Sequence, residues 1–518
     1  MAKSEKSDKS IKASKRSKFL MSSVVVLLVI CILGFFVYVS GVVPKYGTGV
    51  KILKTIDGQQ QTIESISVIE TNYHYYKLLN QYAQYGYLSG IQDLDEVADP
   101  TTGKTYYQMI LDQAATELMD IVILDQAAQA SGFAAHSGAA RMAEMDLENL
   151  RSTAKLQGYG SVDRYLQAMY GAGMTSRVYL ECVEREMLAK EYEQYVNQYD
   201  MYVTADELQA LYDQDPSVYL KADFSYYFFQ GEANEDGTYD LTEARENAET
   251  VTAAADSVES FEQAVIDILG EEEAEEAGFT EDYNPTFAEG YQASSTAYMG
   301  QGVTEFVFVD GEEGDTTIVE GEMGVFALRL DRRYADDNTT VTYRTLTLIN
   351  EKHSDMEASP EEVSAAYEAL VQTAQGYLDS IQTADNKSLA FLDLIKKYST
   401  SNYEIVYGGF NEGVTKDQFE IEPVEGEALT QQQQNIIALG EWLFAAERQN
   451  GDTTMLRSQD QRLLTLYFFE ESCPEWMATA RKQLRTARAN AWSTTILSEG
   501  DPTYAIAYEF IKKCSYSA

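Results

Sequence analysis

Histidine is the side chain best suited to acid–base chemistry near neutral pH, and this chain of 518 residues has only three. They are His74, His136 and His353, and they stand far apart in the sequence. His74 lies among aromatic residues of a helical pattern, where we expect a packed or surface histidine. His353 follows a predicted strand in a polar stretch, where we expect a solvated loop. No G-x-S-x-G, Walker or H-E-x-x-H motif accompanies them, so the usual hydrolase, nucleotide and zinc-protease sites are not predicted.

The four cysteines also give no catalytic or metal pattern. Cys31 lies in a long apolar run, and Cys182 lies in a helical pattern where a buried thiol is expected. Cys473 and Cys514 bracket the last helical segment and could form a disulfide, although spacing alone does not give the pairing. No C-x-x-C or Cys/His cluster is present, so we expect neither a structural metal nor a cofactor.

One acidic loop has the oxygen ligands that calcium prefers. It runs Asp310-Gly-Glu-Glu-Gly-Asp315. The loop lacks the ligand spacing of an EF-hand, and it lies where a repeated unit needs a turn. We therefore expect a turn, with a specific ion site as the minor alternative.

That repeated unit is marked by the sequence GDTT, which occurs at 314–317 and again at 451–454. EFVF precedes the first copy and EWLF precedes the second. After each copy the chain enters an apolar run that is typical of a strand. The pattern strand, long helix, short helix, turn, helix, GDTT turn and strand occurs twice, which predicts two related α/β domains at 221–335 and 341–472.

Helical patterns flank the two repeats. Apolar residues recur at intervals of three and four through most of 60–216, and Thr204 to Glu207 forms a capping box. We expect this region to be all helical. After Pro474 the segment 474–518 is helical again, and its last part, from Tyr504 onward, is expected to be a short helix or strand.

The N-terminus has the pattern of a membrane anchor. Residues 1–18 carry seven basic and two acidic side chains, and 19–43 contain no charge. A helix of that length crosses the ~30 Å hydrocarbon layer, whereas a cleaved signal peptide has a shorter apolar region of about 7–15 residues. The positive flank predicts a cytoplasmic tail, a single span in the cell membrane, and an extracytoplasmic location for the rest.

The remainder after this tail is strongly acidic. It carries 32 basic and 81 acidic residues, a net charge of −49. Such a surface repels phosphate backbones, so nucleic-acid binding is excluded. The charge favours solubility and tolerates cationic clients or divalent ions.

The order of these segments resembles the SurA/PrsA group of extracytoplasmic chaperones, which carry parvulin-type prolyl isomerase domains. The segment VTYRTLTLI resembles the first parvulin strand, and FLDLIKKYSTSNYEIVYGGF resembles the helix and G-G turn that follow. The segments EWLFAAERQNGDTT and QRLLTLYFFEE are similar to the closing helix, turn and last strand. The region 60–216 is similar to the SurA N-terminal chaperone domain.

The resemblance also implies where an isomerase centre would lie. Parvulins have two histidines, on the first and last strands. The first-strand position corresponds to Ser225 in one repeat and Thr345 in the other, and the last-strand position to Val325 and Arg462. None is a histidine, so we expect both repeats to be degenerate, with no catalytic residue.

The predicted fold class is therefore α+β: an anchor helix, an all-α SurA-like region, two parvulin-like domains and a C-terminal helix that returns to the helical region. The resemblance implies an anchored extracytoplasmic chaperone whose partners are unfolded or secreted polypeptides. One alternative is an active prolyl isomerase with a non-standard site. A second is a scaffold subunit of a membrane or envelope complex.

Overall fold

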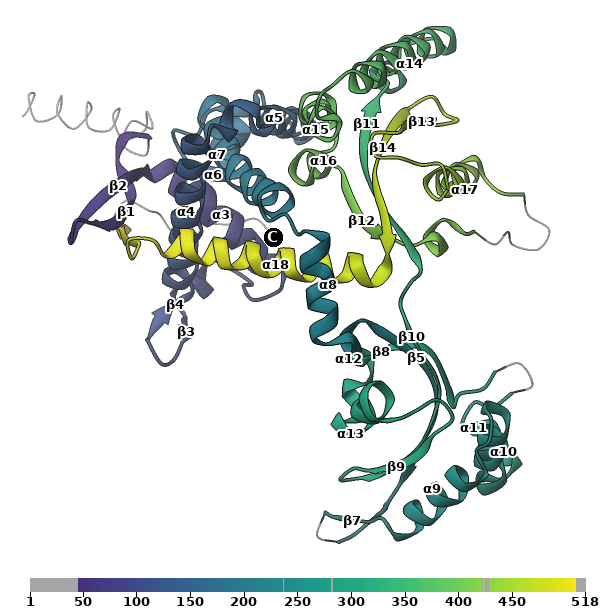
Figure 1. Cartoon of the computed structure of the whole chain (residues 1–518). Helices are drawn as coiled ribbons and strands as arrows, with labels where there is room; N and C mark the ends of the chain where they lie inside the picture. Colours follow the sequence, from purple (N-terminus) through teal and green to yellow (C-terminus); the bar gives the residue numbers. More distant parts are fainter. Residues whose placement is uncertain (1–44, 236, 281–282, 422, 424–427, 509–518) are drawn as a thin grey trace, which may run out of the picture.

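The computed structural model describes residues 45–508 except 236, 281–282, 422 and 424–427. The predicted cytoplasmic tail, the predicted span at 19–43 and Cys514 lie outside these residues. Among the helices that are described, none combines the length and the apolar character needed to cross a membrane. The described chain is a mixed α+β structure with several small sheets (Figure 1).

The region 60–216 is not all helical, which corrects the expectation from periodicity. Strand β1 (Thr48–Ile56) and strand β2 (Gln59–Ser67) form an antiparallel hairpin before the first helix. Asp57 and Gly58 at its tip have φ of 52° and 75°. This Asp-Gly turn is a strong hairpin signal, because two-residue turns of this hand need positive φ. A second small hairpin joins β3 (Val97–Asp99) to β4 (Lys104–Thr105).

Helices make up the rest of this region, which we call the helical body. Its main helices are α3 (Val68–Gln84), α4 (Tyr106–Ser131), α5 (Ala139–Leu156), α6 (Val162–Tyr170), α7 (Ser176–Tyr195) and α8 (Ala205–Gln214). The capping box at Thr204 is present, because its hydroxyl accepts from the Glu207 amide and the Glu207 carboxylate accepts from the Thr204 amide. Helix α18 (Glu475–Ser498) returns along the body, as Figure 1 shows in yellow.

The end of the described chain closes the N-terminal sheet. Strand β15 (Thr503–Ile506) pairs antiparallel with β1, which gives the order β15-β1-β2. Val50, Ile52 and Ile66 pack from this sheet against α4. The two ends of the described chain are therefore joined in one sheet.

Each of the two repeats contains one four-stranded antiparallel sheet. The first block, 221–335, has the order β8-β5-β10-β9, and the second block, 341–472, has the order β12-β11-β14-β13. In chain order, both sheets read second, first, fourth, third. The strands are β5 (Leu220–Gln230), β8 (Phe287–Gln292), β9 (Thr316–Glu320), β10 (Gly324–Ala335), β11 (Thr339–Ile349), β12 (Phe410–Val414), β13 (Thr453–Arg457) and β14 (Leu463–Pro474).

Helices cover both faces of each sheet. In the first block α9 (Thr242–Ala254) and α10 (Val258–Leu269) pack on one face, α11 (Glu271–Glu276) follows them, and α12 (Ala293–Thr296) and α13 (Gln301–Glu305) lie on the other face. In the second block α14 (Pro360–Gln382) and α15 (Lys387–Tyr398) pack on one face, α16 (Asn402–Tyr407) follows, and α17 (Gln431–Leu443) lies on the other.

The GDTT turns have the same geometry in both blocks. Gly314 and Gly451 have φ of 91° and 92°. The Gly314 amide donates to Leu330 and the Leu330 amide donates to Asp315. Gly451, Phe469 and Asp452 make the same two bonds. The threonines that follow begin β9 and β13, the edge strands. The repeated letters therefore mark one turn, used twice to join a helix to an edge strand.

Candidate functional site

The GDTT bonds align the two blocks residue by residue, and this alignment corrects the one made from sequence. Leu330 corresponds to Phe469, and their partners on the first strands are Phe224 and Tyr343. Ser225 therefore corresponds to Arg344 and not to Thr345. Adjacent strand residues point to opposite faces, so Ser225 and Thr345 lie on opposite faces of their sheets.

The equivalence of Ser225 and Arg344 extends to their partners. The Ser225 hydroxyl donates to the Asp331 carboxylate at 2.7 Å, and the Arg344 Nε donates to the Glu470 carboxylate at 2.6 Å. Asp331 and Glu470 both sit where the register of the last strand shifts by one residue. Both pairs are half-buried or buried, so these positions hold structural contacts between the first and last strands.

The two expected last-strand positions are not equivalent either. Val325 is fully buried in β10 and packs against the α9 and α10 face. Arg462 is exposed and lies in the turn before β14. Val325 corresponds to Leu464. The structure therefore brings no two of Ser225, Val325, Thr345 and Arg462 together as a catalytic pair.

A groove lies beside the second sheet, between α17 and the strands β13 and β14. Its volume is about 650 Å³, within the range of ligand pockets. We call it the α17 groove. Its apolar part is formed by Ile436, Leu439, Leu456, Leu463 and the ring of Tyr467, and its polar part by Thr430, Gln431, Gln432, Asn435, Ser458, Gln459, Asp460, Arg462 and Thr465.

The period-two alternation of β14 explains why this face is mixed. Leu464, Leu466 and Phe468 point to the α14 and α15 core and are fully buried. Thr465 and Tyr467 point the other way and line the groove. Thr345 lies opposite Tyr467 in the ladder, so its side chain is on the groove face as well. Its hydroxyl lies 3.5 Å from the Gly409 carbonyl oxygen, at the limit of a hydrogen bond.

The groove has no group prepared for proton transfer. Burial raises the pKa of Tyr467, and the neighbouring Tyr343 ring, 6.2 Å away, adds to the effect. The Ser458 hydroxyl and the Arg462 amide lower the pKa of Asp460, which therefore stays ionised. Arg462 forms no ion pair within the described part of the chain. These groups can hold a polar or charged ligand, but none is matched to acid–base work near neutral pH.

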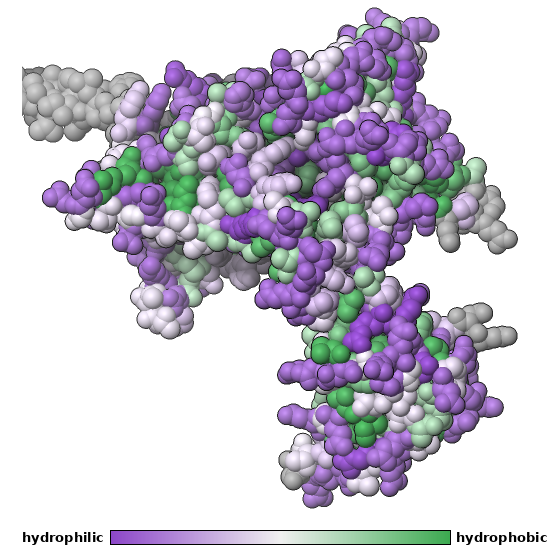
Figure 2. Space-filling view, viewed as in Figure 1, coloured by the Kyte–Doolittle hydropathy of each residue, from purple (hydrophilic) through white to green (hydrophobic). Residues whose placement is uncertain are grey.

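The equivalent face of the first block is packed differently. Gly302 of α13 lies directly against Val319 of β9, so a Cβ there would meet the valine methyl at 2.9 Å. Aromatic rings fill the strand positions: Tyr226, Phe228 and Phe326 stand where the second block has Thr345, Thr347 and Thr465. Burial and the neighbouring Tyr298 raise the pKa of Tyr226 to about 12. Figure 2 shows green apolar patches on the surface of this block.

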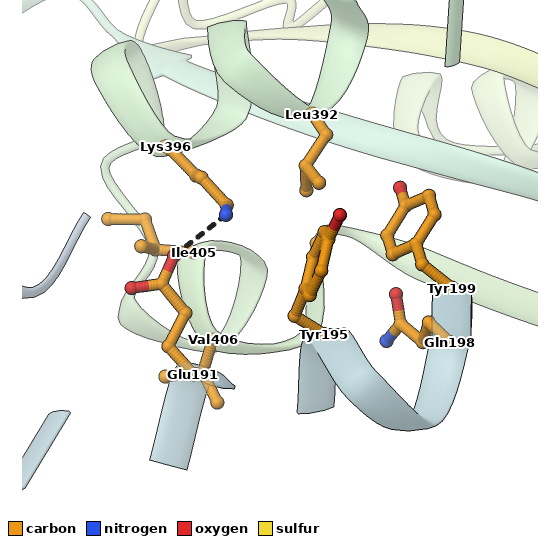
Figure 3. Close-up of a pocket in the computed structure, with 9 residues that line it drawn as sticks. Glu191, Tyr195, Gln198, Tyr199, Leu392, Lys396, Ile405 and Val406 are labelled. Carbon is orange, nitrogen blue, oxygen red and sulfur yellow. Dashed lines mark ion pairs between the residues drawn. The ribbon is translucent and has the colours of Figure 1, made fainter. Parts of the chain in front are cut away.

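A second cavity lies where the second block meets the helical body, and it is too small for a ligand. Its volume is about 10 Å³, and Figure 3 shows its lining. Glu191 of α7 and Lys396 of α15 form an ion pair there at 3.3 Å, and both are almost fully buried. Glu191 also accepts from Ser137 and from the Gly138 amide. Burial raises the pKa of Glu191 and lowers that of Lys396. This ion pair links α7 of the helical body to α15 of the second block.

The remaining residues considered from sequence lie apart from the groove or at its edge. His74 is buried beside Tyr73, at a ring distance of 4.9 Å, and burial lowers its pKa to about 4. His353 is exposed after β11, near Asp460. His136 ends the short turn Phe133–His136.

Cys182, Cys473 and the acidic loop, which the structure describes, show no ion site. Cys182 is buried and Cys473 is a half-buried free thiol, and the proposed partner Cys514 lies outside the described residues. The side chain of Asp315 accepts from the Glu312 amide and so shapes its turn. Across the residues that the structure describes, no group of three or more His, Cys, Asp or Glu side chains is arranged to hold a metal ion.

Sequence reasoning did not find the α17 groove. Its lining comes from three segments whose approach depends on tertiary packing. One signal was present in the alternation of Leu464 to Phe468 with Thr465 and Tyr467, which indicates a strand with one apolar and one mixed face.

Comparison with known proteins adds no assignment. No protein-family model matches the chain, and no curated protein matches it significantly.

Proposed function

We propose that this protein is a membrane-anchored, extracytoplasmic, chaperone-like protein that binds unfolded or secreted polypeptides, and that the α17 groove is a binding site for them. The observation that carries the proposal is the groove itself, with its apolar part, its polar part and no acid–base pair among its lining residues. The resemblance to the SurA/PrsA group supports the proposal, as does the common strand order of the two sheets. The anchor rests on the apolar segment 19–43.

An extended polypeptide fits the chemistry of the groove. Ile436, Leu439 and Leu456 offer contacts to apolar side chains without selecting one shape. The Gln432 amide can bond to peptide groups of any sequence, whereas the Gln431 amide already donates to Asn435 and the Asn435 amide to the Arg457 carbonyl. Binding of this kind is weak for each residue and broad in sequence, as a chaperone requires.

The edge of the sheet offers a second means of holding a peptide. Within the described residues β13 pairs only with β14, so its outer backbone groups face away from the ladder. The Asn435 amide already bonds to the Arg457 carbonyl on that strand, at 3.1 Å. An extended peptide can add to such an edge through its main chain, independent of its sequence.

The same groove does not favour catalysis of prolyl isomerisation. The uncatalysed barrier is about 20 kcal/mol, and a catalyst must stabilise the twisted amide. The groove has neither imidazole nor an ionisable pair tuned to neutral pH, and the hydroxyls of Tyr343 and Tyr467 stay protonated. We therefore propose that both sheet domains lack isomerase activity.

Binding can be tested with a permanently unfolded probe, a reduced and alkylated model protein carrying a fluorophore. Full-length protein in detergent micelles is titrated and Kd is measured by anisotropy. Leu463→Gln places an amide in the apolar part of the groove, and because Leu463 is 36% exposed, its fold is expected to survive. We expect this variant to weaken binding several-fold. The matched control is Leu156→Gln, at an exposed leucine of α5, which should leave Kd unchanged.

Two outcomes of this experiment would count against the proposal. Equal Kd values for both variants and the wild type would remove the α17 groove from the proposal. No binding of any unfolded probe, with one stoichiometric partner recovered by crosslinking, would favour the scaffold.

The isomerase alternative has its own measurement, exchange NMR on a panel of Xaa–Pro peptides. We expect exchange at the uncatalysed rate. Exchange above that rate, lowered by Thr345→Ala or Arg462→Ala, would replace the proposal with a non-standard isomerase.

A further inference from the structure

The first block is joined to the rest of the molecule at one end. The chain enters it at Leu220 and leaves it at Ala335, and these two residues are partners in the β5–β10 ladder. Figure 1 shows the block extending away from the helical body beyond the start of α18. Because the chain enters and leaves the first block at neighbouring positions, this point has the geometry of a hinge between the first block and the rest of the molecule.

Three segments meet at this hinge. They are the entry strand at Lys221, the exit linker at 336–338 and the first turn of α18. The Trp476 amide donates to the Asp336 carbonyl at 3.0 Å, and the Glu475 amide donates to the Asn338 carbonyl at 2.8 Å. The Tyr219 and Trp476 rings pack in one apolar cluster beneath them.

One charged side chain from each segment converges on the same point. The Lys221 ammonium lies 2.8 Å from an Asp336 carboxylate oxygen and 3.2 Å from a Glu475 carboxylate oxygen. Asp336 is only 2% exposed. One ammonium thus faces two carboxylates, so the fully ionised cluster carries an excess negative charge beside a buried acid.

Within the part of the chain that the structure describes, the surrounding charges do not supply a second cation to this cluster. On β5 and β10, Asp223 is paired with Arg332 at 2.7 Å. A cleft of about 500 Å³ adjoins the hinge, and its lining includes Lys221 and Glu475. Its other charged groups, Lys416, Asp417 and Glu420, come from the segment after β12, and Lys416 is 3.6 Å from Glu420.

We propose that Lys221, Asp336 and Glu475 form a proton-operated hinge, which fixes the first block against α18 in mild acid and lets it move at neutral pH. Uptake of one proton converts the two carboxylates into a carboxyl and a carboxylate, which can share a hydrogen bond beside the ammonium. Loss of that proton leaves two like charges in contact. Movement of the first block then changes the width of the adjoining cleft.

The direction of the effect follows from proton linkage. Burial raises the pKa of Asp336 from its ordinary 3.8 to about 6, and the Glu475 carboxylate acts in the same direction. The docked hinge therefore binds its proton more tightly than a solvated Asp336 does. Docking becomes more stable as pH falls through 6 toward 4, and that gain is lost as pH rises above 6.

The test uses full-length protein with a dye pair attached through noncanonical residues at Thr250 on α9 and Thr373 on α14, both of which are exposed. Single-molecule energy transfer then gives the distribution of distances between the blocks. We expect a narrow distribution at pH 5 and a broad one at pH 7.5, with a midpoint near pH 6. A wild-type distribution that stays the same between these pH values would overturn the proposal.

Two variants and one control separate the hinge from general acid effects. Asp336→Asn keeps the shape and removes the charge, so its distribution should be narrow at both pH values. Glu475→Gln removes one carboxylate, so its midpoint should move below pH 6, and this variant carries the test if Asp336→Asn does not fold. Asp337→Asn, at the exposed neighbouring residue, should keep the wild-type profile. An Asp336→Asn profile equal to that of the wild type would also overturn the proposal.

Discussion

The two blocks share a sheet topology but are attached to the molecule in opposite ways. The second block is held to the helical body over a wide contact. Lys396 pairs with Glu191, and Ile405 and Val406 pack in the same apolar cluster as Phe133. Among the described residues, the first block meets the rest at the hinge described above and through α12, which contacts the turn at Pro216–Tyr219. One block therefore shares a packed interface with the helical body and has an open groove, while the other projects away from the body.

Arginine contacts add to the attachment of the second block. The Arg141 guanidinium donates to the Tyr398 carbonyl at 3.1 Å, and Arg485 of α18 holds Glu412 of the second block through two bonds of 2.6 Å. Arg344 donates to Glu470 and to the Gly408 carbonyl, and stacks within 5.2 Å of Tyr199 of the body. Planar guanidinium groups suit such multiple contacts, which a lysine would not reproduce.

The largest expected effect is on this wide contact. Lys396→Ala leaves the Glu191 carboxylate buried without its cation, which should destabilise the protein by about 3–5 kcal/mol. Lys221→Ala at the hinge should cost less in mild acid, because Asp336, whose pKa burial raises to about 6, can then stay buried as a neutral carboxyl and not as an unpaired charge. Urea unfolding followed by circular dichroism measures both. Similar losses would mean that the two blocks are attached equally firmly.

The matched control for this prediction is the double variant Glu191→Gln with Lys396→Met. It removes both charges and keeps similar volumes, so it should recover most of the stability that Lys396→Ala loses. A double variant as unstable as Lys396→Ala would show that packing and not charge explains the loss.

The helical body and the hinge should respond to acid with opposite signs. Burial lowers the pKa of His74 from 6.5 to about 4, so the unfolded chain binds its proton more tightly than the folded chain does. The stabilising contribution is present above pH 6.5 and is lost as pH falls toward 4, at up to about 1.4 kcal/mol per pH unit. Over that interval the loss approaches about 3 kcal/mol.

Unfolding measured from pH 7 to pH 4.5 checks this prediction, with His74→Gln as the comparison, since it cannot take up the proton. The slope for His74→Gln should be shallower than that of the wild type, whereas the hinge tightens over the same interval. Parallel slopes for the two proteins would contradict the assignment to His74.

The GDTT turns test whether the blocks are equivalent in energy as well as in geometry. Gly314→Ala and Gly451→Ala each put a side chain at a positive φ, which should cost about 1–3 kcal/mol. A Cβ at Gly314 has open space, and one at Gly451 meets only the flexible end of Lys387. We therefore expect similar losses on thermal unfolding. A much larger loss at one turn would show that the blocks depend on it differently.

The smallest expected effect is on binding at the closed face of the first block. Tyr298 is 73% exposed there, beside Tyr226. Because α13 packs directly on β9, Tyr298→Ala should change the Kd for an unfolded probe less than twofold. A loss of affinity as large as that caused by Leu463→Gln would mean that both blocks bind the probe. The two blocks would then not differ in binding.

Local sequence signals predicted the elements of this fold better than their arrangement. The capping boxes at Thr204 and Ser359 marked helix starts that the structure contains. A short helix or strand was expected from Tyr504 onward, but the choice of a strand at Thr503–Ile506 depends on its partner β1, which lies at the other end of the described chain. The hairpin at Asp57–Gly58 did have a local signal, its Asp-Gly turn. It was not predicted because the helical pattern that begins soon after the hairpin was extended back over strand β2.

The site was harder to predict than the elements. Ser225 and Thr345 were matched by their place in the pattern of the first parvulin strand, whereas the ladders show a shift of one residue between them. Such a shift moves a side chain to the other face of the sheet. From the sequence, Arg344 is expected to be an ordinary polar residue of a strand. Its burial depends on Tyr199 and Glu470, which are distant in sequence. The α17 groove depends on how α17 lies over the sheet, and no local pattern specifies that.

The pairing of β15 with β1 has a consequence for the biosynthesis of the protein. Strand β1 is synthesised well before its partner β15, because the helical body and both blocks lie between them in the chain. Until β15 is made, β1 has an open edge, and such edges invite pairing with other chains. The N-terminal sheet can therefore be completed only after β15 has been made, and a chain truncated before Thr503 would keep that edge exposed.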